Sequence, residues 1–163
     1  MLSLIVAISE NNGIGKAGDL LCHLPNDLKH FKELTTGATV VMGKKTFFSL
    51  PRRPLPNRRN IVLTRDTAFA YDNTEVAHSI HELQSMLQTN ERVFIIGGGE
   101  VYKQFMPLAD ELHITHIHHI WADADTFFPQ IDPLVWKVAE RSGCMHDEES
   151  GFDFEFVTYE RMK

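Results

Sequence analysis

The sequence contains little of what marks disulfide-rich, membrane or nucleic-acid-binding proteins. It has only two cysteines, Cys22 and Cys144, which are too few for a disulfide framework and are consistent with a reducing compartment. No apolar run approaches the length of a transmembrane helix. The 16 basic residues are outnumbered by 22 acidic ones, and the net charge of −6 argues against nucleic acid as a partner. We therefore expect a protein with neither nucleic-acid nor membrane partners.

The N-terminal residues 1–8 are apolar, but they lack the basic leader and the small-residue cleavage site of a signal peptide. We interpret them as a strand and, together with the two cysteines, they lead us to expect a cytoplasmic protein. The length of 163 residues and a hydrophobic fraction of 43% suit one globular domain with a large core. We expect residues 1–163 to form that single domain.

Apolar segments and segments with helical periodicity alternate along the chain. We expect strands over residues 2–9, 39–43, 60–64, 75–77, 93–96, 111–120, 136–140 and 152–156, and helices over 25–34, 44–50, 79–88 and 100–106. Residues 11–23, including Gly18, and residues 123–129 are expected to be loops. The alternation predicts an α/β fold: a central, mostly parallel twisted sheet of about eight strands with an antiparallel C-terminal edge, flanked by about four helices.

One acidic side chain stands out in the first predicted helix. The apolar residues of this helix form a stripe at helical spacing: Leu24, Leu28, Phe31 and Leu34. Asp27 lies beside this stripe, and no basic residue is next to it on its own side. Either Asp27 only occupies a first turn, where the helix dipole favours an acid, or it binds a partner from outside the helix.

Three consecutive glycines, 97–99, follow a predicted buried strand and precede a helix. This context is typical of a backbone site for a diphosphate, although Tyr102 departs from the standard dinucleotide fingerprint; a tight, closely packed turn is the alternative. Lys44, Thr46, Thr64 and Arg65 lie at the ends of two adjacent strands and can bind phosphates. Lys44 and Arg65 would suit an extra ribose phosphate and so favour NADPH over NADH, although a solvated basic rim is equally compatible with them.

Four histidines, His113, His116, His118 and His119, lie close together in the sequence. His116 and His118 share one face of a strand, a spacing that zinc sites use. No cysteine is near them, and the acids Asp123 and Asp125 are in a different loop. We favour a structural or surface role for the histidines and expect no metal site.

Separate motifs along the chain carry a family resemblance: Ala7, Ile14-Gly15, Leu24-Pro25-x-Asp27-Leu28, Phe31, Met42-Gly43-x-x-Thr46, Arg53-Pro54-Leu55-Pro56, Arg58-x-Asn60, Ile96-Gly97-Gly98-Gly99, Tyr102, Thr115-His116 and Asp125-Thr126-x-Phe128-Pro129. In this order, over essentially the whole chain, they resemble bacterial dihydrofolate reductases. The resemblance implies NADPH-dependent reduction of 7,8-dihydrofolate to 5,6,7,8-tetrahydrofolate, by hydride transfer to C6 with protonation of N5. It places the enzyme in tetrahydrofolate biosynthesis and one-carbon metabolism.

The resemblance also implies which residues form the site. The catalytic positions match Asp27, Thr115, Leu20 and Cys22. The substrate-binding positions match Ile5, Asp27, Leu28, Phe31, Leu50, Arg53, Arg58 and Thr115. The cofactor-binding positions match Ala7, Ile14, Gly15, Leu20, Gly43, Lys44, Lys45, Thr46, Leu63, Thr64, Arg65, His78, Ile96, Gly97, Gly98, Gly99, Glu100, Val101, Tyr102 and Thr126.

Within this set, Asp27 is implied to take two parallel hydrogen bonds from the pterin ring, while Thr115 braces its carboxylate. We expect burial to raise the pKa of Asp27. Arg58 matches the arginine that pairs with the carboxylate of the glutamate tail. Dihydrofolate, NADPH and antifolate inhibitors are the implied partners, and we expect a monomer.

Three positions depart from the family pattern. Leu21-Cys22 stands where the family usually has Pro-Trp, so we expect an altered pocket volume and proton delivery, unless neighbouring side chains refill the space. Glu100 stands where many relatives have a cation, and His78 where some have a lysine.

Three other functions remain open at this point. A pyrimidine reductase of riboflavin synthesis would share the architecture and NADPH, although Asp27 and Arg58 favour folate. A non-catalytic folate- or nucleotide-binding module would explain the change at Cys22. A zinc enzyme built on the histidines is the third.

Overall fold

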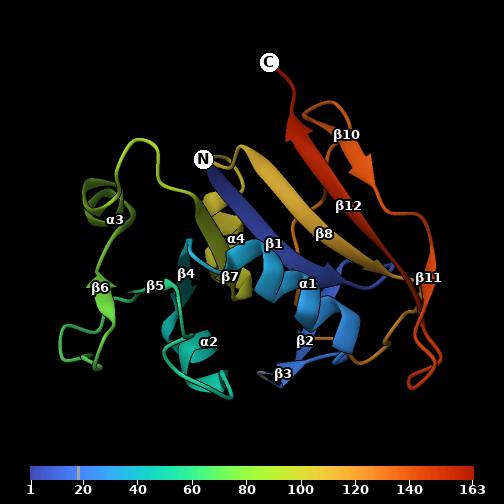
Figure 1. Cartoon of the computed structure of the whole chain (residues 1–163), viewed down its shortest axis with the longest axis horizontal. Coiled ribbons are helices and arrows are strands. Elements are labelled where there is room, and N and C mark those ends of the chain that lie inside the picture. The colour runs from blue at the N-terminus through green and yellow to red at the C-terminus, as the bar shows by residue number, and fades with distance from the viewer. Residues whose placement is uncertain (18) are drawn as a thin grey trace.

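A computed structural model describes residues 1–17 and 19–163 (Figure 1), so the expectation for Gly18 lies outside the described residues. One large sheet runs through the molecule. In spatial order its strands are β10 (Trp136–Arg141), β12 (Asp153–Arg161), β8 (Glu111–Ile117), β1 (Leu2–Ile8), β7 (Val93–Gly97), β4 (Thr39–Gly43), β5 (Arg59–Leu63) and β6 (Glu75–Ala77), and β11 (Met145–His146) pairs with β12. All neighbours from β8 to β6 are parallel, whereas β12 is antiparallel to β8 and β10. The predicted mixed sheet with an antiparallel C-terminal edge is confirmed.

Four helices accompany the sheet: α1 (Pro25–Thr35), α2 (Lys44–Ser49), α3 (Ile80–Met86) and α4 (Gly99–Phe105). Pro25 begins α1, and the chain leaves this helix at Gly37, whose φ of 84° suits a residue without a side chain. Ser79 caps α3 by accepting a hydrogen bond from the backbone N–H of Glu82 at 3.0 Å, as the capping pattern predicts. No helix in the described part of the chain is both long and apolar enough to span a membrane.

The core lies on both faces of the sheet because successive side chains of a strand point to opposite faces. On β1, Leu4 packs in a cluster with Val101 and Phe105 of α4, whereas the next residue, Ile5, packs in a cluster with Phe31 of α1. Helices α1 and α4 therefore cover opposite faces. This explains why the central strands are apolar on both sides.

Two segments predicted to be loops contain strands. β2 (Gly13–Lys16) pairs with β3 (Asp19–Leu20) and with β9 (Thr126–Phe127), which gives a separate small sheet in the order β3, β2, β9. The loop predictions for residues 11–23 and 123–129 were wrong where these strands form. The pairing of β2 with β9 joins segments more than 100 residues apart, a contact that local sequence does not encode.

Two strand lengths and one buried stripe also differ from expectation. β8 ends at Ile117, where its pairing with Phe154 of β12 ends, rather than at residue 120, and β12 extends to Arg161. The stripe on α1 is only partly covered: Leu24 is buried, Phe31 and Leu34 are half-buried, and Leu28 is 52% exposed. Leu28 is therefore surface that a ligand can contact rather than part of the core.

Candidate active site

Asp27 and Thr115 form the polar centre of the site. Asp27 lies in the first turn of α1, and its Oδ1 accepts a hydrogen bond of 2.5 Å from the hydroxyl of Thr115. Thr115 is buried on β8 and lies opposite Ala7 of β1. The contact joins residues 88 positions apart and holds the carboxylate between the helix and the sheet.

Burial dominates the electrostatics of Asp27 and raises the pKa of its carboxyl group above the ordinary value. The hydrogen bond from Thr115 and the nearby His30 oppose this shift to a smaller extent. Burial also lowers the pKa of His30, whose ring stacks on Phe156 at a centroid distance of 3.9 Å. The expected direction of the Asp27 shift is confirmed, and its cause is the loss of water around the charged form.

An apolar wall continues from this centre. Ile5, Phe31 and Leu50, which were predicted to bind substrate, belong to one hydrophobic cluster with Met42 and Phe47. The cluster lies on the α1 face of the sheet. The structure therefore brings these three residues together beside Asp27, as a flat aromatic ring system would need.

Two of the residues predicted to bind substrate are arginines, and Arg58 borders this wall at Phe31. Arg58 donates hydrogen bonds to the Thr35 hydroxyl (2.9 Å) and the Pro56 carbonyl oxygen (2.8 Å), and its Cζ lies 5.8 Å from the centre of the Phe31 ring. Arg53 donates to the carbonyl oxygen of Phe48 at 2.6 Å. Each guanidinium keeps unused N–H donors, because arginine has five of them.

The glycine turn lies between β7 and α4 and is closely packed, most tightly at Gly99. Gly97 has φ of 128°, and the Gly97–Gly98 peptide bond is cis. A Cβ on Gly97 would lie 3.4 Å from the Tyr102 hydroxyl oxygen, and one on Gly98 would lie 3.3 Å from Thr46 Oγ1. A Cβ on Gly99 would approach Thr126 to 2.7 Å. The turn thus meets Thr46 and Thr126 from two other segments and presents backbone where a phosphate can approach.

Three more predicted cofactor residues belong to this region. A Cβ on Gly43 would lie 3.3 Å from Val101 and 4.0 Å from the backbone nitrogen of Gly98, and Ile14 lies 3.9 Å from the Cβ position of Gly99. The Tyr102 hydroxyl donates to the carbonyl oxygen of Ile5 at 2.8 Å, which ties α4 to β1. Tyr102 is therefore buried scaffolding behind the turn.

The predicted basic rim lies farther along the same sheet edge. Lys44 Nζ is 3.1 Å from Asp66 Oδ2, and both side chains are about 40% exposed. The Nδ1 of His78 is 2.9 Å from the carbonyl oxygen of Thr64. Asp66 was not predicted, although its position next to Arg65 in the sequence was a signal that an acid borders the cations.

The remaining predicted residues fall into exposed and covered groups. The exposed ones are Leu20, Lys45, Arg65 and Glu100, and the covered or half-covered ones are Ala7, Gly15, Leu63, Ile96 and Val101. Glu100 is in the first turn of α4, where the helix dipole favours an acid. A contact missed from the sequence joins the small sheet to its neighbouring loop: Lys16 Nζ binds Asp123 Oδ2 at 2.5 Å, and the Ala17 backbone N–H binds Asp125 at 2.9 Å.

Cys22 is half-buried and packs against a cluster centred on Leu24, Ile117 and Phe154. Trp121 and Phe152 pack against the same cluster. Burial raises the pKa of the Cys22 thiol, which keeps it protonated. Cys22 therefore shares one hydrophobic cluster with two bulky aromatic side chains.

The histidines lie with different partners. His113 Nε2 is 3.1 Å from Glu111, His116 Nε2 is 2.8 Å from the Tyr159 hydroxyl, and His118 is 3.8 Å from Glu10. Among residues 1–17 and 19–163, no group of three or more histidine, cysteine, aspartate or glutamate side chains is placed to hold a metal ion. A zinc site built on these histidines has no geometric support there.

Comparison with known proteins points to one family. The family model described as dihydrofolate reductase matches residues 1–161. The chain is 40% identical over 161 residues to the dihydrofolate reductase of Bacillus subtilis, covering 99% of this chain and 95% of that protein. It is 42% identical over 163 residues to the type 3 dihydrofolate reductase of Salmonella typhimurium, covering 100% and 99%. Among solved structures, it is similar to the Enterococcus faecalis dihydrofolate reductase complexed with NADP(H) and RAB-propyl, with a TM-score of 0.91, 40% identity and coverage of 100% and 97%.

Proposed function

Because this chain belongs to the dihydrofolate reductase family and reduces 7,8-dihydrofolate to 5,6,7,8-tetrahydrofolate with NADPH, we propose that Asp27 is the side chain that binds and orients the pterin ring. The Asp27 carboxylate accepts two parallel hydrogen bonds from the amino group and a ring N–H of the pterin. Such paired, charge-assisted bonds fix both distance and orientation. The hydroxyl of Thr115 holds the carboxylate in place from behind.

Asp27 also influences protonation of N5. Because its pKa is raised, Asp27 can hold a proton at a higher pH than an exposed aspartate can. The carboxyl group acts on N5 through its charge and through water rather than by direct contact. Ile5, Phe31 and Leu50 line the pterin and benzoyl regions, where they exclude water from the ring.

The residues around the glycine turn suit a dinucleotide. NADPH supplies the hydride that C6 receives. The backbone of residues 97–99 and the Thr46 hydroxyl bind the diphosphate, since added Cβ atoms would fill that cradle. Lys44, Thr64 and Arg65 bind the 2′-phosphate end, and Ala7, Ile14 and Leu20 contact the nicotinamide.

Arg58 binds the carboxylate of the substrate's glutamate tail with the N–H donors that its bonds to Thr35 and Pro56 leave unused. We extend the proposal to the whole chain: a single domain over residues 1–163, acting as a cytoplasmic monomer without nucleic-acid or membrane partners, and binding antifolate inhibitors in the pterin pocket.

The Asp27–Thr115 contact carries this assignment, because it holds a half-buried carboxylate one helical turn from Phe31 of the apolar wall. The test is NADPH oxidation upon addition of dihydrofolate, with NADH and the Asp27→Asn variant run in parallel. We expect rapid turnover with NADPH, slower turnover with NADH and a collapse of turnover in the variant. Tight folate binding without turnover with either cofactor would instead favour a non-catalytic binding module.

A further inference from the structure

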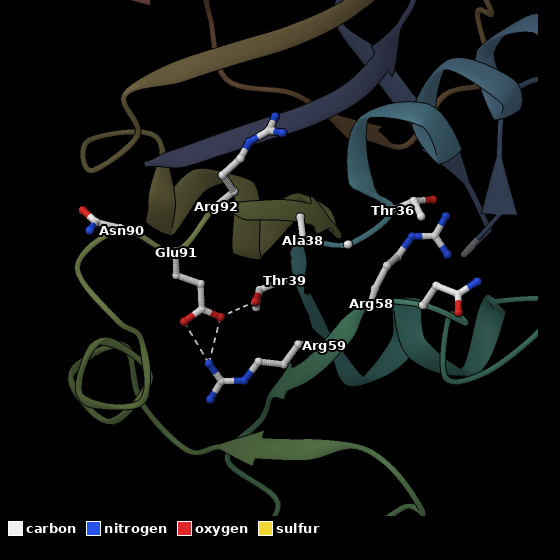
Figure 2. A pocket seen from close by; sticks show the side chains of 10 residues that line it. Thr36, Ala38, Thr39, Arg58, Arg59, Asn90, Glu91 and Arg92 are labelled. Carbon is white, nitrogen blue, oxygen red and sulfur yellow. Dashed lines mark hydrogen bonds and ion pairs between the residues drawn. The ribbon is translucent and has the colours of Figure 1, made fainter.

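Two consecutive arginines, Arg58 and Arg59, lie at the end of the sheet where β4, β5 and β7 begin. They line a pocket of about 570 Å³ together with residues 36–39, 90–92 and Asn57. Figure 2 shows the two guanidinium groups pointing away from each other. Arg58 has a place in the proposed reaction, because it binds the substrate's tail, whereas the reaction assigns no role to Arg59.

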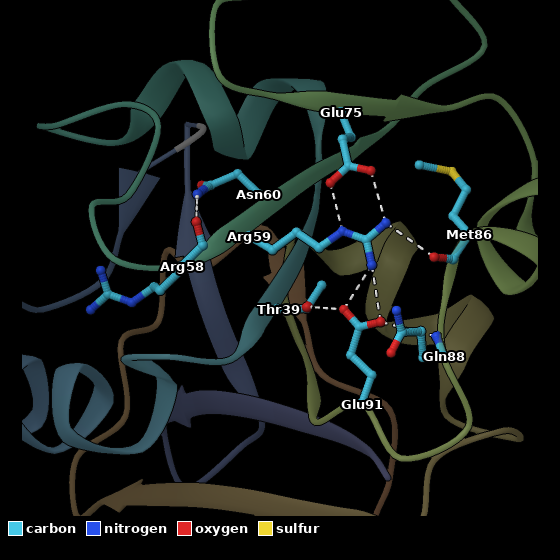
Figure 3. A network of polar contacts seen from close by, with 8 residues as sticks. All are labelled: Thr39, Arg58, Arg59, Asn60, Glu75, Met86, Gln88 and Glu91. Atoms are coloured by element: carbon cyan, nitrogen blue, oxygen red, sulfur yellow. Dashed lines mark hydrogen bonds and ion pairs between the residues drawn. The ribbon is translucent and has the colours of Figure 1, made fainter.

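Arg59 is the centre of a polar network (Figure 3). It donates to Glu75 at 2.6 and 2.8 Å, to Glu91 at 2.8 and 2.9 Å, and to the Met86 carbonyl oxygen at 3.0 Å. These bonds use all three guanidinium nitrogens and match the five N–H donors that an arginine has. Two carboxylates also neutralise its charge. Arg59 is therefore committed to the protein and is not suited to bind an anionic ligand itself.

The network joins segments that are far apart in the chain. Arg59 is the first residue of β5, Glu75 is the first residue of β6, and Glu91 lies just before β7. Glu91 also accepts hydrogen bonds from the Thr39 hydroxyl of β4 and from the backbone N–H of Gln88. The Arg59 and Glu91 side chains are only 30% and 16% exposed, so water and salt screen this pair less than a pair on the open surface. The start of β5 is therefore tied to its neighbours on both sides.

Arg58 directly precedes this anchored residue. The backbone N–H of Arg59 donates to the carbonyl oxygen of Ala38 at 3.1 Å, and the side-chain amide of Asn60 donates to the carbonyl oxygen of Arg58 at 3.0 Å (Figure 3). Successive side chains along an extended chain point to opposite sides. A fixed direction for the Arg59 side chain therefore sets the opposite direction for that of Arg58, whose Cζ lies 5.8 Å from the ring centre of Phe31.

We propose that Arg59 is a positioning residue for substrate binding: its network fixes the start of β5, so that Arg58 presents its unused N–H donors to the carboxylate of the substrate's tail. The inference rests on the proposed role of Arg58. Charge-assisted hydrogen bonds depend on the distance and direction between the partners, so a small displacement of Arg58 weakens binding of the tail. Hydride transfer takes place at the pterin ring beside Asp27, and the network therefore affects KM rather than kcat.

The test measures kcat and KM with NADPH for dihydrofolate and for 6-methyl-7,8-dihydropterin, which has the pterin ring but no tail carboxylate. In Arg59→Gln, KM for dihydrofolate should rise about five- to tenfold, whereas kcat and both constants for the tail-less substrate should stay unchanged. Arg59→Lys keeps the charge but cannot form paired bonds to both carboxylates, so the rise should be smaller. Arg141→Gln is the matched control, because it removes an ion-paired arginine on β10, at the other edge of the sheet, and should change neither KM.

A double-variant cycle tests whether Arg59 acts through Arg58. Arg58→Gln alone should raise KM for dihydrofolate, and adding Arg59→Gln to it should cause no further rise, since the contact that Arg59 supports is already lost. If Arg59→Gln does not fold, Glu75→Gln replaces it in the cycle. That variant keeps the bonds between Arg59 and Glu91 and should raise KM about two- to threefold for dihydrofolate alone.

Three results would overturn the inference: an unchanged KM for dihydrofolate in Arg59→Gln, equal rises in KM for the two substrates, or a full further rise in the double variant. Each would leave Arg59 with a role in folding alone, while the proposed reaction would stand. The proposed role of Arg58 fails on a different result, namely an Arg58→Gln variant whose KM for dihydrofolate equals that of the wild type.

Discussion

The two halves of the proposed site are built on different physical principles. On the pterin side, Asp27 is half-buried and accepts a hydrogen bond from a buried hydroxyl, so partial loss of hydration shifts its pKa. On the phosphate side, Lys44 and Asp66 are both about 40% exposed and remain in contact with water. A charge is strongly perturbed in the first environment and weakly in the second, because water screens exposed pairs. The pterin side should therefore control chemistry, and the phosphate rim should control affinity.

The largest effect is expected from Asp27→Asn. Turnover should fall by about 100-fold or more because the variant loses the charged acceptor. The free energy of unfolding at neutral pH should rise by about 1 kcal/mol, since a buried charge is replaced by a neutral amide.

The sign of the pH dependence follows from the raised pKa of Asp27 in the folded chain. Between the ordinary value of 3.8 and the raised value, the folded state binds more protons, so wild-type stability falls as pH rises through this window. Urea unfolding from pH 4 to 7 should show that fall in the wild type and lose it in Asp27→Asn. Asp72 is exposed, so Asp72→Asn serves as the control. Parallel stability curves for Asp27→Asn and the wild type would contradict the prediction.

Gly97→Ala tests the part of the cofactor half that does not depend on charge. The added Cβ would strain a residue with φ of 128° and lie close to Tyr102 and Thr46, so NADPH affinity should fall about tenfold. Fluorescence titration measures this. Gly143→Ala is matched, because Gly143 also has a positive φ (82°) but no atom within 4 Å of its Cβ position. It should lose stability while keeping NADPH affinity, and equal losses of affinity in both variants would contradict the proposed cradle.

Thr115→Val removes the hydrogen bond that partly offsets the rise in the pKa of Asp27, so this pKa should rise further. The pH profile of kcat/KM should move to higher pH, with about a fivefold loss at pH 7. Thr115→Ser keeps the hydroxyl and should restore the wild-type profile. A profile in Thr115→Val that does not move would show that the hydroxyl acts only in folding.

Cys22→Trp tests whether the Leu24, Ile117 and Phe154 cluster tolerates the larger residue. Because Cys22 packs against the Leu24, Ile117 and Phe154 cluster, tryptophan should overpack this region and lower the free energy of unfolding by about 1–3 kcal/mol. Turnover or inhibitor affinity should change about threefold. Cys144→Trp, at an exposed cysteine, is the control, and unchanged kinetics and inhibition in Cys22→Trp would contradict an effect on the pocket.

The smallest effect is expected at the rim. Asp66→Asn should free Lys44 and increase the preference for NADPH over NADH about two- to threefold, whereas Lys44→Gln should reduce it by a similar factor. Both changes should fade at high salt, which the KM for each cofactor at two ionic strengths would measure. A change in cofactor preference as large as the loss of turnover in Asp27→Asn would contradict the proposed difference between the pterin side and the phosphate side.

Much of the fold followed from local patterns, because strand and helix periodicities are set by near neighbours. The buried strands and the four helices were predictable from apolar runs, Pro25 and the Ser79 cap. The small sheet was missed because β2 meets β9 only after the chain folds. The exposure of Leu28 was not predictable for the same reason: its position belongs to the apolar stripe of α1, but the spacing does not say whether anything covers it.

The candidate site shows the same division. Residue types and their order determined the fold class, the family and the identities of the candidate residues. Only the tertiary structure decided that Thr115 bonds Asp27, that Asp66 pairs with Lys44 and that Arg92 borders a pocket shared with Arg58. Those facts depend on distances between segments far apart in the chain and on how much water each charge loses. A linear sequence specifies which groups are available, and the packed fold sets their separation and their dielectric surroundings.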